Sequence, residues 1–546
     1  MSQGKRKILG APLGHDVHVA GTLRFLRLAE EQGYDTEFLG PAMGLEGIVQ
    51  AAQEYRPDIL AVSYRLTPEL VPALVQELHD ALIEVGLGNI ELIFGGTPPA
   101  AAAAAQTGLF YRCFSGLESI DETIAYLQGR DRQPLVERYP HQLIPRLAAK
   151  RPYPLLRHHF GLPTLADTLA GIKQIAEAKV LDVISIGPDQ NAQASFFRPE
   201  AMDPRQSGAG GVPVRKVEDL EALYAASRTG NYPLLRIYAG TRDLLQWAEL
   251  ATTTLRNAWG AIPLCWYSEL DGRSSRPLAT AIAENLAAIA WYAQRGLPVE
   301  VNEAHHWSLR EASDTIAVVM AYLAAAFAKH QGVQHYVAQY MFNTPNGTWY
   351  NQDFAKMLAK KELLASLHDA NFQSYTQVRS GLASFSANLN QAKGQLASSM
   401  HLALSLQPDI IHVVGFCEAD HVATATDVIE SCEIVAGMLH NAIDGLPQID
   451  HDPAIIARKN ELLAEAQELL AAIGHLGNPA DSLGSDPEVL VAAIRAGILD
   501  APHLAGSGVA KGLLQTRLIN GACVAIDPDT GRPLTERERL QRLALQ

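Results

Sequence analysis

The feature that most constrains the fold is a regular alternation of short apolar runs and helix-like segments over residues 7–130. The apolar runs are "KILGAPLG", "DTEFLG", "DILAVSY" and "IELIFGG", and amphipathic stretches such as "VAGTLRFLRLAEEQG" separate them. Short buried strands that alternate with helices predict a parallel, doubly wound sheet. Ligands of such sheets bind at the carboxyl ends of the strands. We therefore expect a site in the loops "GHDVHVAG", "SYRLTP" and "GGTPP".

A second alternation covers residues 155–430, where strand-like runs such as "VLDVISIG", "YPLLRIYAG" and "IIHVVGF" precede helical patterns. Seven or more such units in this length predict a TIM (β/α)8 barrel, whose functional residues lie at the strand ends. Residues 131–154 form a polar, proline-containing stretch and are the expected linker. Residues 431–546 are expected to form a C-terminal extension packed on the barrel.

Composition narrows the classes of partner. The chain has 546 residues and a formal net charge of −15, which argues against a surface that binds nucleic acid or an anionic membrane. Its longest apolar run, residues 315–328, is too short to span a bilayer, and no signal-peptide core follows the basic start. Five cysteines without a CxxC pair indicate neither a disulfide framework nor a zinc or iron–sulfur cassette. We expect a cytoplasmic homodimer that acts on a small-molecule substrate.

The first loop carries the pattern Asp16-x-His18-x-x-Gly21. A histidine at the end of a strand can bind a metal through one ring nitrogen, and the other nitrogen then needs an acceptor such as Asp16. Gly21 opens the next helix, where a side chain would obstruct a bulky group. The alternative is a solvated loop histidine beside an aspartate that caps the helix. The pattern alone leaves both interpretations open.

Two further loops favour the metal-binding interpretation of His18. With Ser63 in "VSYRLTP" and Gly95 and Gly96 in "IFGGTPP", residues 7–130 resemble the cobalamin-binding domain of adenosylcobalamin-dependent mutases and methionine synthase. The resemblance implies that His18 replaces the nucleotide base as the lower cobalt ligand and that Asp16 orients it. It also implies that the Ser63 hydroxyl bonds the displaced base and that the two glycines give the nucleotide tail access to the backbone. The serine loop is one residue longer than the family pattern, so Leu66 matches less closely.

The barrel region resembles the catalytic subunit of glutamate mutase (methylaspartate mutase). "PLLRIYAGTRDLL" implies that Arg236 binds a substrate carboxylate, and "IGPDQNAQASFFR" places Arg198 near another family arginine. "CWYSELDGRSSRPLATAI" implies a substrate-site tyrosine at Tyr267, and "IIHVVGFCEADHVATATDVIES" implies that Glu418 holds the adenosyl ribose. The family usually divides these regions between two subunits, whereas this chain fuses them. The expected cofactor-binding residues are thus Asp16, His18, Gly21, Ser63, Leu66, Gly95, Gly96, Thr97 and Glu418.

The chain also departs from this family. The glutamate that grips the substrate ammonium is missing from "WGAIPL", and the family lysine near the ribose glutamate falls close to Gly415. Both differences indicate that the substrate is not simply glutamate. Glu269, Asp271 and Arg273 are the charged groups expected to have taken over, and they join Arg198, Arg236 and Tyr267 as the expected catalytic residues. For each single arginine, a surface salt bridge is the alternative.

Together these patterns predict an adenosylcobalamin-dependent mutase that catalyses a radical 1,2-rearrangement of a small, carboxylated, amino acid-like substrate. The expected domains are a cobalamin-binding domain at 1–130, a linker at 131–154, a catalytic TIM barrel at 155–430 and an extension at 431–546. A corrinoid-dependent methyltransferase is the alternative within the same cofactor class. A non-catalytic corrinoid carrier is a third possibility, which a barrel of this length with polar strand ends disfavours.

Overall fold

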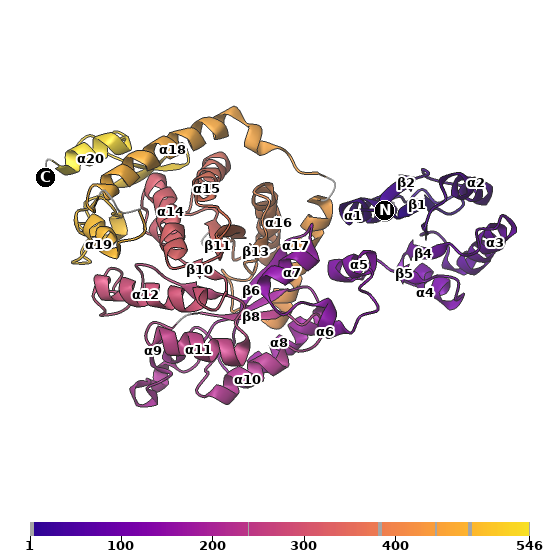
Figure 1. Ribbon diagram of the computed structural model, residues 1–546, viewed down its shortest axis with the longest axis horizontal. Helices are drawn as coiled ribbons and strands as arrows, with labels where there is room; N and C mark the ends of the chain where they lie inside the picture. Colours follow the sequence, from indigo (N-terminus) through magenta and orange to yellow (C-terminus); the bar gives the residue numbers. More distant parts are fainter. Residues whose placement is uncertain (1–4, 239, 380–384, 443–444, 479–482, 545–546) are drawn as a thin grey trace. The chain divides into compact units, whose positions relative to one another are not determined.

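The computed structural model describes residues 5–238, 240–379, 385–442, 445–478 and 483–544. Internal contacts divide the chain into two compact units. Figure 1 colours the chain by residue number, so the residues of each unit can be followed there. The first unit comprises Met1–Arg138 with Leu439–Gly445, and the second comprises Tyr139–Met438 with Leu446–Gln546. The domain boundaries expected from the sequence stay predictions beside this division.

The first unit is built on a parallel sheet of five strands in the order β2-β1-β3-β4-β5. The strands are β1 (Lys7–Pro12), β2 (Asp35–Phe38), β3 (Ile59–Tyr64), β4 (Glu91–Gly96) and β5 (Arg112–Phe114). In the register of the sheet, Pro12 pairs with Ser63 and Ser63 pairs with Gly95. The loops that follow β1, β3 and β4 therefore leave the sheet from one edge, which is the flavodoxin-like arrangement.

Helices connect these strands. They are α1 (Ala20–Glu31), α2 (Leu45–Tyr55), α3 (Val71–Glu84), α4 (Pro98–Gln106), α5 (Ile120–Leu127) and α6 (Leu135–Arg138), with a 3₁₀ turn η1 (Pro68–Leu70). Buried aliphatic and aromatic side chains of β1, β3, β4 and α3, among them Leu60, Phe94 and Leu78, form its core. Gly10 lets α1 approach the sheet closely, because a Cβ there would lie 2.7 Å from Leu26 Cδ1. The apolar side chains that recur along each helix therefore pack against the sheet.

The second unit contains eight parallel strands in the order β8-β7-β6-β13-β12-β11-β10-β9. They are β6 (Leu155–Phe160), β7 (Val183–Ile186), β8 (Leu234–Ile237), β9 (Gly260–Ile262), β10 (Val299–Val301), β11 (His335–Met341), β12 (Gln373–Arg379) and β13 (Ile410–His412). The N–H of Ala258, two residues before β9, donates to Leu235 O of β8 at 2.8 Å, so the chain links the two ends of this order. The sheet is a nearly closed barrel, so the predicted fold class is confirmed.

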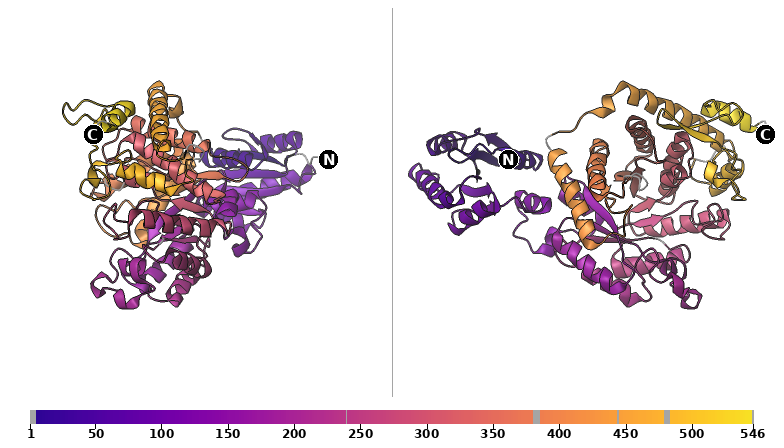
Figure 2. Two further views of the ribbon diagram at one scale, coloured as in Figure 1. Left: turned by 60° about the vertical axis from the view of Figure 1, so that its left-hand side comes forward. Right: turned by 180° about the vertical axis from the view of Figure 1, so that it is seen from behind.

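Helices follow the barrel strands and surround them (Figures 1 and 2). They are α8 (Leu165–Ala178), α9 (Gln190–Ser195), η2 (Pro199–Ala201), η3 (Pro204–Gln206), α10 (Val217–Ala226), α11 (Leu244–Leu255), α12 (Leu278–Ala293), α13 (Ala304–Ser308), α14 (Asp314–His330), α15 (Tyr350–Ala365), α16 (Leu389–Ser405) and α17 (Ala425–Ala442). A strand followed by a helix eight times is the (β/α)8 plan.

The amino-terminal end of the barrel is closed by apolar side chains. Strand residues such as Leu155, Val183 and Leu234 form one buried cluster with Leu143 and Leu147 of α7 (Leu143–Lys150). Because apolar side chains fill this end, polar side chains of the strands gather toward the other end, where the catalytic residues of such barrels lie.

The C-terminal part adds helices and a hairpin. It contains η5 (Ile449–His451), α18 (Pro453–Gly474), α19 (Pro487–Arg495), η6 (Pro502–Leu504), β14 (Thr516–Ile519), β15 (Ala522–Ala525) and α20 (Glu536–Ala544). Helix α18 packs against α14 and α15 of the barrel. Among the described residues, no helix is both long and apolar enough to cross a membrane.

Candidate functional site

The loop after β1 is organised by the side chain of Asp16, which is fully buried. Its Oδ1 atom accepts hydrogen bonds from the His18 backbone N–H at 2.9 Å and from His18 Nδ1 at 2.7 Å. Its Oδ2 atom accepts from the Arg65 backbone N–H at 2.6 Å, which ties the first loop to the loop after β3. The carboxylate thus fixes the protonated nitrogen of His18 as Nδ1, and Nε2 is left as the nitrogen with a lone pair.

The ring of His18 is accessible, since 49% of its side chain is exposed. Space is also open over Gly21, where an added Cβ would meet no atom within 4 Å. The donor set therefore fits a metal-centred group: an imidazole with a free nitrogen, oriented by a buried carboxylate, beside a surface that no side chain fills.

Ser63 and the two glycines lie along the same edge. The Ser63 hydroxyl is buried and accepts a hydrogen bond from Thr22 Oγ1 at 2.9 Å, which leaves its own O–H as a donor. At Gly95 a Cβ would only touch Ser63, whereas at Gly96 it would lie 2.6 Å from Tyr64 O. A residue larger than glycine at Gly96 would therefore push the strands apart. Thr97 is the N-cap residue of α4.

Leu66 lies in the loop after β3, and 46% of it is exposed. Val17 and Leu117 are also exposed apolar side chains of this unit, at 61% and 78%. Exposed apolar side chains that form a contiguous patch are typical of a surface that a ligand covers. These side chains belong to the loops at the carboxyl edge of the sheet, as His18 and Ser63 do.

The barrel holds a cavity of about 420 Å³. Strand residues in its wall are Arg157 and His159 of β6, Arg236 of β8, Glu300 of β10, Gln339 and Met341 of β11, and Arg379 of β12. Loop residues in its wall include Tyr238, Tyr267, Asn302, His305, His306 and Asn343. A pocket of this size, with charged groups converging from several strands, fits a small polar ligand.

Glu300 is the centre of the charged network in this cavity. Its Oε2 atom accepts from Trp259 Nε1 at 2.7 Å and from Arg236 Nη2 at 3.2 Å, and lies 3.6 Å from Arg157 Nη1. Burial alone would raise the pKa of Glu300, but the guanidiniums of Arg236 and Arg157 outweigh it and hold that pKa below its ordinary value. Glu300 is therefore an anion that two arginines share.

The arginines of the cavity differ in how far their donors are used. Arg157 donates to Ser185 Oγ at 2.6 Å and to Gln377 Oε1 at 2.8 Å, so its guanidinium is held on several sides. By contrast, Nε and Nη1 of Arg236 and Nε of Arg379 are buried without a hydrogen-bond partner among the described residues. Unsatisfied buried donors of this kind are costly, and a bound carboxylate would satisfy them.

Histidines add uncharged polar groups to the wall. The Tyr238 hydroxyl and His159 Nε2 are 2.8 Å apart, and the two rings stack with their centroids 5.0 Å apart. Burial and the nearby arginines hold the pKa of His159 well below its ordinary value. Burial, reinforced by Arg379, lowers the pKa of His305 to about 3. Near neutral pH these histidines therefore act as neutral donors or acceptors.

Of the residues expected from the sequence, Tyr267 lines the cavity together with Arg236. Tyr267 has a positive φ of 58°, a conformation that is uncommon for a bulky residue. The Arg273 guanidinium lies 3.8 Å from the centre of its ring, and Asp271 accepts from the Tyr267 backbone N–H at 3.3 Å. The loop therefore holds this tyrosine from its backbone and from one face of its ring.

The acids of this loop have internal partners. Asp271 has a fully buried side chain that also accepts from Arg273 Nε at 2.6 Å. Glu269 accepts from the backbone N–H of Leu278, the first residue of α12, at 2.9 Å. Neither acid, nor Arg273, is among the residues that line the cavity. Their contacts support a role in shaping the loop.

Arg198 and Glu418 also lie outside the cavity wall. Arg198 forms a two-pronged ion pair with Asp243, the residue before α11, with Nη1 and Oδ1 3.0 Å apart. Glu418 lies in the loop after β13; burial raises its pKa, and the nearby Arg379 opposes that rise. The structure thus places Glu418 within electrostatic reach of a residue that does line the cavity.

The sequence reasoning missed Arg157, Glu300 and Arg379. Strand β6 reads "LLRHHF", and its inward residues are polar, so it does not look like a buried strand. Glu300 lies within β10 and Arg379 at the end of β12, at positions where a charged residue in the sequence suggests exposure to solvent. The signal that could have found them is the alternation of strands: the inward positions of several barrel strands carry charge.

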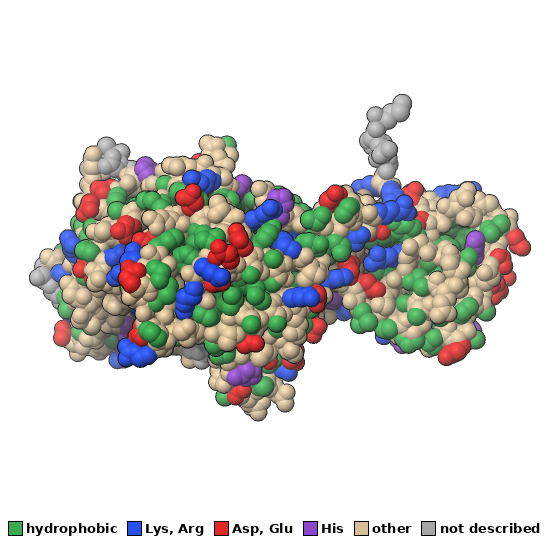
Figure 3. Space-filling model, turned by 90° about the horizontal axis from the view of Figure 1, so that it is seen from below, with side chains coloured by type: hydrophobic (Ala, Val, Ile, Leu, Met, Phe, Trp, Pro, Cys, Tyr) green, Lys and Arg blue, Asp and Glu red, His purple; other side chains and the backbone are tan. Residues whose placement is uncertain are grey.

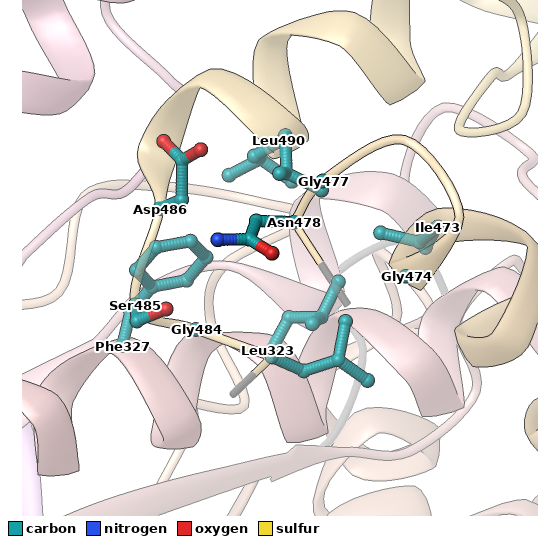
Figure 4. Close-up of a pocket in the computed structure, with 12 residues that line it drawn as sticks. Leu323, Phe327, Ile473, Gly474, Gly477, Asn478, Gly484, Ser485, Asp486 and Leu490 are labelled. Carbon is teal, nitrogen blue, oxygen red and sulfur yellow. The ribbon is translucent and has the colours of Figure 1, made fainter. Parts of the chain in front are cut away.

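A second cavity, of about 30 Å³, lies between α14 and the segment that follows α18 (Figure 4). Leu323, Phe327 and Ile473 contribute apolar surface to it, and Asp486 is its ionisable group. This volume holds little more than a water molecule.

On the surface, acidic and basic side chains are interspersed over the face drawn in Figure 3. The expectation that the chain binds no nucleic acid stays a prediction.

Comparisons with known proteins bear on the first unit. Residues 6–124 match the family model of the B12 binding domain. The small subunit of pivalyl-CoA mutase from Xanthobacter autotrophicus (strain Py2) is 26% identical over 137 residues, which cover 24% of this chain and 90% of that protein.

Two solved structures are also similar in part. A cobalamin-binding protein from Desulfitobacterium hafniense DCB-2 is 29% identical, with 20% of this chain and 53% of that chain covered and a TM-score of 0.19. The cobalamin-dependent S-adenosylmethionine radical enzyme OxsB is 11% identical, with 68% of this chain and 57% of that chain covered and a TM-score of 0.19. The chain thus spans only about half of each protein, and TM-scores this low do not establish a shared overall fold.

The match over residues 6–124 coincides with the five-stranded unit that carries Asp16, His18, Ser63 and Gly96. These findings support a cobalamin cofactor. The N-terminal unit is therefore a B12-binding domain, and the same chain continues into a nearly closed parallel barrel with an arginine-lined cavity.

Proposed function

We propose that this protein is an adenosylcobalamin-dependent mutase that rearranges a small carboxylated substrate by a radical 1,2-shift. The observation that carries the proposal is that one chain joins a B12-binding domain to a barrel whose cavity presents guanidinium N–H groups without a hydrogen-bond partner among the described residues. The similarity to a protein described as the small subunit of a CoA mutase supports a mutase over a simple carrier.

On the cobalamin side, we assign His18 as the lower cobalt ligand. Asp16 holds the proton on Nδ1, so Nε2 is the nitrogen available to the metal. Adenosylcobalamin supplies a carbon-centred radical through homolysis of its cobalt–carbon bond. The residues assigned to the nucleotide tail and the edge around it are Gly21, Ser63, Leu66, Gly95, Gly96 and Thr97.

On the barrel side, Arg236 binds a substrate carboxylate through Nε and Nη1, which have no hydrogen-bond partner in the part of the chain that the structure describes. Glu300 holds that guanidinium in place, and Tyr267 presents its hydroxyl to the same cavity. Glu418 is assigned to the adenosyl group.

The other charged residues expected at the site are assigned to positioning. Asp271, Glu269 and Arg273 shape the loop that carries Tyr267. Arg198 fixes the start of α11 through Asp243. A homodimer remains the expected assembly, and sedimentation of the holoprotein tests it.

Reconstitution with adenosylcobalamin tests the proposed reaction. The holoprotein is mixed with a panel of amino acids, branched acids and dicarboxylic acids and examined by electron paramagnetic resonance. We expect one compound to produce a signal of an organic radical coupled to cobalt(II). A protein that stays silent across the panel and instead transfers the methyl group of methylcobalamin would be a corrinoid methyltransferase.

A further inference from the structure

The charges in the barrel cavity do not balance. Three guanidiniums line it, those of Arg157, Arg236 and Arg379, and Glu300 is the single carboxylate among the lining residues. Three positive groups and one negative group leave a surplus of two positive charges. The histidines of the wall add no charge near neutral pH, because burial holds the pKa of His305 and His306 well below the ordinary value.

Two of these arginines have donors to offer. Arg157 is tied to Ser185, Gln377 and Glu300. Arg236 and Arg379, in contrast, have buried N–H groups with no hydrogen-bond partner among the described residues. These donors match a carboxylate oxygen in charge and geometry.

The two arginines lie on different walls. Arg236 is on β8 and Arg379 is on β12, and three strands separate β8 from β12 in either direction around the barrel. A ligand with an anionic group at each of two ends can therefore satisfy both. A short chain with two carboxylates meets that need within about 420 Å³.

Among the described residues that line the cavity, no carboxylate is left to receive an ammonium group; Glu418, which interacts with Arg379, does not line it. Glu300 is already shared by two arginines and Trp259. Glu303, the next acidic residue along the chain, accepts hydrogen bonds from the Leu264 and Cys265 backbone N–H groups and from Trp307 Nε1. It does not line the cavity. Residues 239 and 380–384, outside the described ranges, are Ala and Ser-Gly-Leu-Ala-Ser and contain no acid.

We infer that the cavity selects a short dicarboxylate without a free ammonium group over the corresponding amino acid. This inference rests on the proposed function only in treating the cavity as the substrate site. The physical reason is that a lining with three guanidiniums and one carboxylate attracts a second anion and repels a cation.

Isothermal titration calorimetry of the full-length holoprotein tests it without turnover. The probes are succinate, glutarate and adipate, their 2-amino counterparts aspartate, glutamate and 2-aminoadipate, and the monocarboxylate butyrate. The best-bound dicarboxylate should bind at least about tenfold more tightly than its amino counterpart and than butyrate. Equal or tighter binding of the amino acid overturns the inference, and so does the absence of binding by all three dicarboxylates.

A charge-changing variant sharpens the test. Asn302 lines the cavity two residues beyond Glu300, and Asn302→Asp adds a carboxylate of the same size. This variant should shift the preference toward the amino acid by at least about tenfold. The control Asn302→Gln changes the size but not the charge and should leave the preference in favour of the dicarboxylate.

The two proposals fail separately. A holoprotein that binds a dicarboxylate but gives no radical signal with it keeps the inferred ligand class and refutes the mutase. A radical signal with an amino acid that also binds more tightly than its dicarboxylate keeps the mutase and refutes the ligand class.

Discussion

The two candidate sites of this protein are built in opposite ways. In the B12-binding domain, Asp16 and His18 are two residues apart, and one buried carboxylate positions one accessible ring. In the barrel, Gln377 accepts a hydrogen bond from the cavity residue Arg157, although the two are 220 residues apart in the sequence. A site made by one loop leaves a motif in the sequence, whereas a site made by many strands leaves scattered charges.

The two sites also differ in their electrostatics. His18 faces open space, and a single hydrogen bond determines which nitrogen it offers. The barrel groups interact with one another in an enclosed volume, where charges act more strongly than in water. Removing one barrel group should therefore disturb several others, while changes near His18 should stay local.

A fall in pH should produce the largest difference in stability between the two units. The barrel encloses His158, His159, His305, His306 and His412, and burial lowers the pKa of each, to about 4 for His158. Such histidines contribute stability above pH 6.5, and the contribution is lost as the pH falls from 6.5 toward the folded-state pKa. Each can weaken the barrel by up to about 1.4 kcal/mol per pH unit.

We therefore expect the barrel to unfold between pH 6.5 and 4.5 before the B12-binding domain does. All six tryptophans lie in the second unit, namely Trp247, Trp259, Trp266, Trp291, Trp307 and Trp349. Tryptophan fluorescence thus follows the barrel alone, and circular dichroism follows both units. Fluorescence that stays native down to pH 4.5 would contradict the expectation.

Arg236→Met should have the next largest effect. It removes the ion-pair partner of Glu300 at 3.2 Å and leaves that buried carboxylate with Trp259 and the more distant Arg157. The loss of one partner of a buried pair costs about 3 kcal/mol, so the unfolding temperature of the barrel should fall. Substrate binding, measured by calorimetry, should weaken by about 100-fold or more.

Two matched variants separate these effects. Adding Glu300→Gln to Arg236→Met removes the orphaned charge and should recover stability but not binding. Arg198→Met breaks the partly exposed pair with Asp243 and should cost at most about 1 kcal/mol. If Arg198→Met lowers the stability as much as Arg236→Met does, the buried pair in the cavity contributes no more to stability than the partly exposed pair.

His18→Ala should weaken cobalamin binding and reduce turnover by about 100-fold, because it removes the assigned lower ligand. The absorption spectrum of the bound corrinoid should also lose the features of histidine coordination. His15→Ala is the control, since His15 is exposed in the same loop. Equal corrinoid affinity and spectra in the two variants would exclude the ligand role.

Asp16→Asn should have a smaller effect, about tenfold in cobalamin affinity. The amide cannot accept from both the His18 ring and the Arg65 backbone N–H, so it loses one of these bonds. Arg65→Ala keeps the backbone N–H and should leave the affinity unchanged. If Asp16→Asn binds cobalamin normally, then Asp16 does not tune the ring.

Much of the fold follows from patterns that the sequence shows directly. The buried strands of the first unit and their helices repeat regularly, and the order of "GHDVHVAG", Ser63 and Gly95-Gly96 places them on one edge of the sheet. The barrel class also follows from its repeat. Strand β6 is not predicted from the sequence, because its inward positions are arginine and histidine and the usual apolar pattern of a buried strand is absent.

The barrel site could not be read in the same way. Its charged groups become a site only when the strands close and bring their inward positions together. Glu269 and Asp271 looked like site residues because they are acids near a tyrosine, yet their hydrogen bonds are made within their own loop and to α12. The distinction between a charge that meets a ligand and one that shapes a loop depends on contacts that sequence spacing does not specify.

The apolar closure of the barrel floor has a kinetic consequence. With Leu143 and Leu147 of α7 packed among the strand residues at that end, the barrel is a cup rather than a tube. Under the proposed function, substrate and product therefore pass the same rim, because the other end offers no exit. Product should therefore compete directly with substrate, and its departure should be a natural point at which the rate of the whole cycle is limited.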